Sequence, residues 1–79
     1  MLNLTEANQM SFDRITSIIE RLRTEYNILV NQSSVTMSDN GPVITLSIPG
    51  FTICYDMLLD NAAIKMSGFL FGVYYIDNI

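Results

Sequence analysis

The side chains best suited to chemistry in this sequence are one thiol and a few carboxylates. Cys54 is the only cysteine, and histidine is absent. The chain therefore lacks the residue most often used for acid–base catalysis near neutral pH and for metal ligation. No His, Lys or Arg is expected beside Cys54, so nothing evident lowers the pKa of its thiol toward the reactive thiolate. We interpret Cys54 as a small residue within a strand.

Three aspartates, Asp56, Asp60 and Asp77, carry the oxygen ligands that Mg²⁺ and Ca²⁺ prefer. Their spacing matches no calcium-binding loop, and the segment Asp39-Asn40-Gly41 is only a fragment of one. Positions in turns and at strand ends explain all three carboxylates. The sequence thus predicts no catalytic residue, no cofactor site and no metal site.

The composition indicates that a monomer would leave apolar surface exposed to water. The 79 residues are 49% hydrophobic and only 15% charged, and we expect one small domain spanning residues 1–79. A chain of this length buries only about 60% of its unfolded surface, so part of the apolar area stays outside a monomer's core. Association with itself or with another protein would cover that area.

The charge argues against nucleic acid as a partner. The formal net charge is −4, and the chain has four cationic residues, whereas nucleic-acid binding needs a basic stripe. A single cysteine and an N-terminus without a signal-peptide pattern predict a cytoplasmic location. The nearly uncharged run 62–76 contains Lys65 and is too short to span a bilayer, so no direct membrane insertion is expected.

An amphipathic helix is predicted over residues 11–29. Ser11 is a candidate N-cap, and Thr5 is the candidate if the helix begins earlier. Apolar residues recur at three- and four-residue steps, which is the helical period: Phe12, Ile15, Ile18, Ile19, Leu22 and Tyr26. On the opposite side, the spacings of Glu20–Arg23 and Arg21–Glu25 suit weak surface ion pairs.

Two strands are predicted over residues 43–48 and 51–57. Apolar and polar residues alternate strictly in both, and Pro49-Gly50 lies between them. A two-residue connection pairs Ile48 with Phe51, and continues with Leu46–Ile53 and Ile44–Tyr55. Pro-Gly favours a type II turn, which fits strand twist less well than the primed turns. The pattern therefore predicts a hairpin with one apolar face, with Cys54 on the other.

Further strands are predicted over residues 33–38, 62–67 and 69–76, because successive turns would keep the same apolar face. A turn at Asp39–Pro42 would pair Met37 with Ile44. The result is an α+β fold, an N-terminal amphipathic helix packed on one face of a four- to five-stranded antiparallel meander. The alternative is an α-β-β-β-α order with a helix near 58–67, because apolar residues there also fit a helical stripe. Gly68 and Gly72 would each cost such a helix about 1 kcal/mol.

In the meander, Leu70, Tyr74 and Ile76 point away from the helix-covered face, on the last strand of the sheet. A free strand edge with tyrosine and aliphatic residues has the composition of a protein interface. The sequence therefore predicts a non-enzymatic protein-interaction module that binds itself as a homodimer and acts as an adaptor or stoichiometric inhibitor. Small size and the lack of catalytic motifs also fit a protein encoded by a phage or mobile element.

Two alternatives remain. One is a small enzyme or ligand-binding domain that uses Cys54 or the aspartates. The other is a partner of a membrane surface or membrane protein, which the aromatic C-terminal region suggests.

Overall fold

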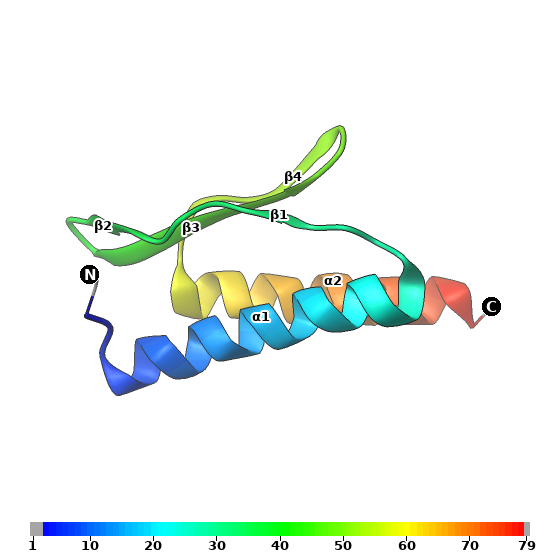
Figure 1. Cartoon of the computed structure of the whole chain (residues 1–79), viewed down its shortest axis with the longest axis horizontal. Helices are drawn as coiled ribbons and strands as arrows, with labels where there is room; N and C mark the ends of the chain where they lie inside the picture. The colour runs from blue at the N-terminus through cyan, green and yellow to red at the C-terminus, as the bar shows by residue number, and fades with distance from the viewer. Residues whose placement is uncertain (1–2, 79) are drawn as a thin grey trace.

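The computed structural model describes residues 3–78 and has two layers (Figure 1). One layer is formed by α1 (Glu6–Tyr26) and α2 (Leu59–Asp77), which lie side by side and run in the same direction. The other layer is an antiparallel sheet that covers one side of both helices. The predicted α+β class, with an N-terminal helix on one face of an antiparallel sheet, is confirmed.

Helix α1 begins earlier and ends earlier than the predicted range 11–29. Thr5 is the N-cap, and its hydroxyl accepts a hydrogen bond from the Asn8 N–H at 3.2 Å. Asn27 ends the helix with φ 56°, in the left-handed conformation that asparagine tolerates better than most residues. Ile15, Ile18 and Leu22 are buried. The apolar stripe was therefore predicted correctly, and of the two candidate caps Thr5 is the one used.

The sheet has four strands, and the two shortest lie end to end along the same edge of the central strand. The central strand is β3 (Gly41–Ile48), with β4 (Phe51–Leu58) along one side. The short strands β1 (Asn31–Gln32) and β2 (Thr36–Ser38) share the other side. Of the predicted strand 33–38 only residues 36–38 are a strand, and β1 lies just before the predicted range. A tight turn pairs Ser38 with Gly41 and Met37 with Pro42 instead of Ile44.

The β3–β4 hairpin keeps the predicted register only next to its turn. Ile48 pairs with Phe51 as predicted, and Gly50 has φ 81°, which fits a type II turn. Two register shifts follow in β4, so that Leu46 pairs with Cys54 and Ile44 with Met57. The predicted pairs Leu46–Ile53 and Ile44–Tyr55 are therefore wrong. β-Bulges insert extra residues into one strand, which a strict alternation pattern cannot reveal.

The C-terminal part of the chain is helical, so the strands predicted over 62–67 and 69–76 are wrong. Helix α2 follows β4 directly and is longer than the helix near 58–67 of the alternative α-β-β-β-α order. The buried residues of α2 lie at helical spacing: Leu59, Ala62, Ala63 and Met66. Their burial outweighs the roughly 2 kcal/mol cost of two helical glycines and the strand preference of the aromatic residues.

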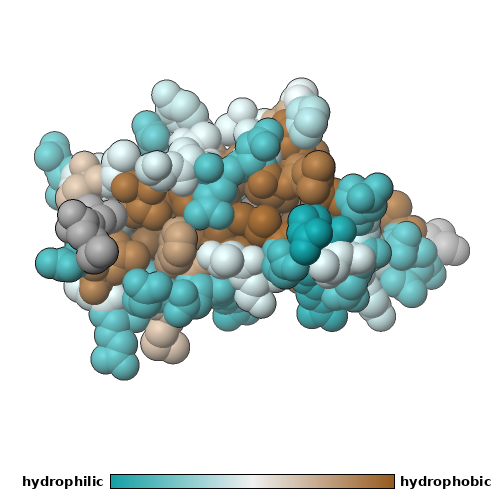
Figure 2. Space-filling view, viewed as in Figure 1, coloured by the Kyte–Doolittle hydropathy of each residue, from teal (hydrophilic) through white to brown (hydrophobic). Residues whose placement is uncertain are grey.

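The core lies between the sheet and the two helices. Its fully buried side chains include Ile15 and Leu22 from α1, Ile44 and Leu46 from β3, and Leu59 and Met66 from α2. The polar outer side of α1 lies along the lower edge of Figure 2, while apolar side chains reach the surface between the layers. The two helices and the β3–β4 hairpin thus each contribute apolar side chains to the core, and what distinguishes the two helices is their opposite sides.

Candidate functional site: the outer face of α2 and the helix groove

The predicted interface residues Leu70, Tyr74 and Ile76 all lie on α2 and not on a strand edge. Leu70 is half-buried against the core, whereas Tyr74 and Ile76 are 53% and 72% exposed. The physical basis given for this surface, an unpaired edge of a C-terminal strand, is therefore wrong. The three residues remain candidates on different grounds, because α2 as a whole is rich in exposed apolar side chains.

Helix α2 carries half of the ten large hydrophobic residues that are exposed within residues 3–78: Ile64, Phe71, Tyr74, Tyr75 and Ile76. Ile64, Phe71 and Tyr75 are 71%, 68% and 61% exposed. Together with Gly68 they follow a 4-3-4 spacing, which aligns them along one side of a helix. We call these four residues the α2 outer face.

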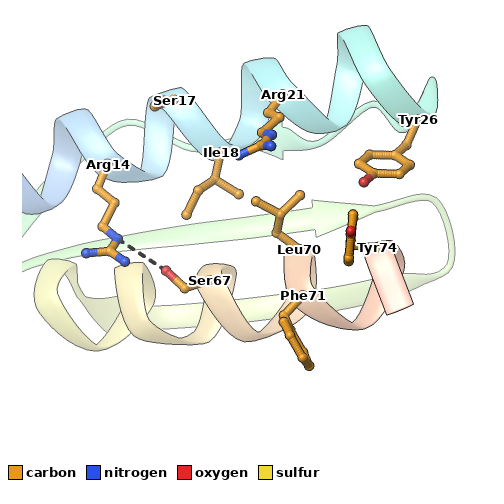
Figure 3. A pocket seen from close by; sticks show the side chains of 9 residues that line it. All are labelled: Arg14, Ser17, Ile18, Arg21, Tyr26, Ser67, Leu70, Phe71 and Tyr74. Atoms are coloured by element: carbon orange, nitrogen blue, oxygen red, sulfur yellow. Dashed lines mark hydrogen bonds between the residues drawn. The ribbon is translucent and has the colours of Figure 1, made fainter. Parts of the chain in front are cut away.

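A groove of about 570 Å³ runs between the two helices and includes Phe71 of that face (Figure 3). We call it the helix groove; its lining residues are Arg14, Ser17, Ile18, Arg21 and Tyr26 of α1 and Ser67, Leu70, Phe71 and Tyr74 of α2. Ile18 and Leu70 point toward one another at its floor, while Phe71 points away from α1. A second hollow, which includes Arg14 and Ser67, continues the groove toward Asp60 and Ile64.

Arg14 reaches across the helix groove. Its Nε donates a hydrogen bond to Ser67 Oγ at 3.2 Å, and the Ser67 hydroxyl donates to the Ala63 carbonyl at 2.8 Å. Within the described chain Arg14 forms no salt bridge, whereas Arg21 is paired with Glu25 at 2.6 Å. The groove therefore combines an apolar floor with one guanidinium that no carboxylate neutralises.

The far end of the groove is aromatic. Tyr26 and Tyr74 lie close together there, one from each helix. Desolvation and then the negative charges of Glu25 and Asp77 raise the pKa of Tyr26. Its phenol is therefore neutral at physiological pH and can donate or accept a hydrogen bond.

Cys54 lies in the core and not on the outer side of the hairpin, because the register shifts in β4 turn it inward. It is 1% exposed, and burial raises the pKa of its thiol, an effect that Lys65 partly opposes. A buried and protonated thiol is a poor nucleophile. The structure thus places Cys54 among the packing residues.

The three aspartates lie apart from one another. Asp56 has φ 43° in β4, where its backbone N–H donates to Thr45 Oγ1 at 3.1 Å and its carboxylate accepts from the same hydroxyl. Asp60 lies in the first turn of α2 and Asp77 ends that helix. No group of three carboxylates or thiols that could hold a metal ion occurs within residues 3–78.

The free sheet edge on the β4 side is poorly suited to pairing with another chain. Both register shifts fall in β4, and Asp56 there has a positive φ. Bulges disrupt the ladder of backbone groups that an incoming strand would need. The exposed side chains of α2 are therefore a better candidate site than the sheet edge.

Sequence reasoning missed Ile64, Phe71 and Tyr75 because it assigned their segment to strands. A signal was present: Leu59, Ala62, Ala63, Met66, Leu70 and Val73 recur at helical spacing. Once that stripe is taken as the buried side of a helix, the α2 outer face follows as the opposite side. Arg14 was missed because its place in the groove depends on how the two helices pack.

No family model matches the chain, and neither a curated protein nor a solved structure is detectably similar to it. Among the described residues, neither helix combines the length and the apolar character needed to cross a bilayer. The function is therefore inferred from the geometry of this chain alone.

Proposed function

We propose that this protein is a non-enzymatic interaction module that docks another protein surface on the α2 outer face and the adjoining helix groove. The observation that carries the proposal is the exposure of Ile64, Phe71 and Tyr75 along one side of a helix that is also apolar on its buried side. A helix that is hydrophobic all round is normally buried. Contiguous exposed apolar surface marks interaction sites in soluble proteins.

The charge distribution supports a protein partner. Lys65 is the only charged residue of α2 between Asp60 and Asp77, and interface centres are depleted in charge and enriched in aromatic residues. A net charge of −4 opposes attraction to anionic lipid. Such a module acts by occupying its partner, which is how an adaptor or a stoichiometric inhibitor works.

Site-specific photo-crosslinking tests the proposal. A photoreactive phenylalanine analogue replaces Phe71 on α2, and in a matched control it replaces Thr24, an exposed residue of α1. Illumination in a native lysate should give discrete protein adducts from position 71 and none from position 24. Equal labelling at the two positions, or adducts with lipid alone at position 71, would contradict a protein-docking role for α2.

A further inference from the structure

The α2 outer face is complementary to itself. Its residues Ile64, Gly68, Phe71 and Tyr75 have the 4-3-4 spacing of a coiled-coil seam and extend about 16 Å along the helix. Gly68 leaves open space in the middle, because no side chain and no other part of the chain lies within 4 Å of the position that a Cβ would occupy there. Phe71, three residues farther along the same side, is 68% exposed.

The chain exposes more surface than a compact monomer of its size. A compact monomer of 8.9 kDa is expected to expose about 4800 Å². This chain exposes 5416 Å², an excess of about 600 Å² over that expectation. Stable protein interfaces bury about 800 Å² on each partner. One additional contact of ordinary size would therefore bring the exposed area of each copy to or below the expected value.

The distribution of charge favours this face for contact between two copies. Each chain carries a net charge of −4, so two copies repel one another over most of their surfaces. The α2 outer face contains no charged residue, and Lys65 lies about 100° around the helix from Ile64. Contact through this face therefore brings no like charges of the face itself together.

We propose that a second copy of this chain covers the α2 outer face. The two α2 helices pair antiparallel, and the two-fold axis crosses each helix at the level midway between residues 69 and 70. That axis sets Phe71 of each copy over Gly68 of the other, and Ile64 over Tyr75. A parallel pair would instead set Phe71 against Phe71 and align the two helix dipoles unfavourably. This inference rests on the proposed function and names the partner.

Light scattering after size-exclusion chromatography, at up to about 0.1 mM protein, tests the pairing. The wild-type chain should be a dimer. Ile64→Glu and Tyr75→Lys should each weaken dimerisation at least about 10-fold. In an equimolar mixture, the two variants form a heterodimer with one native contact and one Glu–Lys contact. That mixture should contain a larger fraction of dimer than either variant alone at the same total concentration.

Circular dichroism accompanies each sample, and Ile64→Gln replaces Ile64→Glu if the charged variant loses helix. Thr24→Glu, on the outer side of α1, is the matched control and should leave dimerisation unchanged. A monomeric wild type would overturn the inference, while protein adducts from position 71 would still support docking on α2. A dimer that neither variant weakens would exclude this face, and failure of the mixture to recover dimers would exclude the antiparallel register.

Discussion

The two helices of this protein have similar lengths and pack against the same sheet, yet only α1 has a polar, solvent-facing outer side and a side-chain cap. Its outer side carries two ion pairs, Arg21–Glu25 and Arg23–Glu20, and Thr5 caps its N-terminus. Helix α2 has one cation, no side-chain cap at its start and large exposed apolar residues. Similar burial on the inner sides accompanies opposite chemistry on the outer sides, so the outer sides identify the site.

The inner sides provide the largest expected effects, and these should be similar in the two helices. Leu22 of α1 and Leu59 of α2 are both fully buried. Leu22→Ala and Leu59→Ala should each lower the free energy of unfolding by about 2–5 kcal/mol, through lost transfer free energy and the cavity left behind. Urea denaturation monitored by circular dichroism measures the loss. An effect below about 1 kcal/mol at Leu59 alone would show that α2 contributes little to the fold.

The outer side of α2 should affect stability only through association. At a concentration about 100-fold above the Kd of the dimer, binding adds about 2.7 kcal/mol to apparent stability. Phe71→Gln should remove that increment, yet change the stability of the dilute monomer by less than about 0.5 kcal/mol. Thermal unfolding over a range of protein concentrations separates the two contributions.

Thr24→Gln, on the outer side of α1, is the control for this substitution. The Tm of the wild type and of the control should rise together with concentration, and the Tm of Phe71→Gln should stay constant. A wild-type Tm that is independent of concentration would show that neither outer side supports self-association.

The ends of the helices give a smaller effect. Thr5 accepts a hydrogen bond from the Asn8 N–H, so Thr5→Ala should destabilise the protein by about 1 kcal/mol. Thr5→Ser retains the hydroxyl and should preserve most of the stability. Thermal unfolding of both variants at one low concentration measures the difference. Equal losses in the two would show that the methyl group of Thr5, and not the cap, supports α1.

The contrast between the helices also explains how far the sequence could predict the fold. The stripe of α1 has one period and a polar opposite side, so its helix was predicted, with errors only at the ends. Within residues 62–76 only Lys65 and Ser67 have polar side chains apart from the tyrosine hydroxyls, so periods of two and of 3.6 both fit. Packing of Leu59 and Met66 into the core stabilises the helix over the strands, and this packing is not visible in a single sequence.

The errors in the hairpin have a similar physical origin. The Ile48–Phe51 pair was predicted from the turn beside it, whereas the register shifts farther along β4 arise from a local backbone conformation. Asp56 has φ 43° and exchanges hydrogen bonds with the Thr45 hydroxyl. No alternation pattern encodes that conformation. Cys54 was consequently assigned to the wrong face of the hairpin.

The smallest expected effect concerns the ion pairs on the outer side of α1. The hydrogen bond from Arg23 lowers the pKa of the exposed Glu20 carboxyl below its ordinary value of 4.5. A lowered folded-state pKa means that the pair stabilises the protein above the unfolded pKa, and that this contribution is lost as the pH falls through the folded pKa.

Carboxyl chemical shifts in an NMR titration should give a Glu20 midpoint below 4.5. Arg23→Gln should raise that midpoint, and high salt should reduce the difference. Identical midpoints in the wild type and Arg23→Gln would mean that the pair does not form in solution. The outer side of α1 would then be distinguished from that of α2 by its polarity alone.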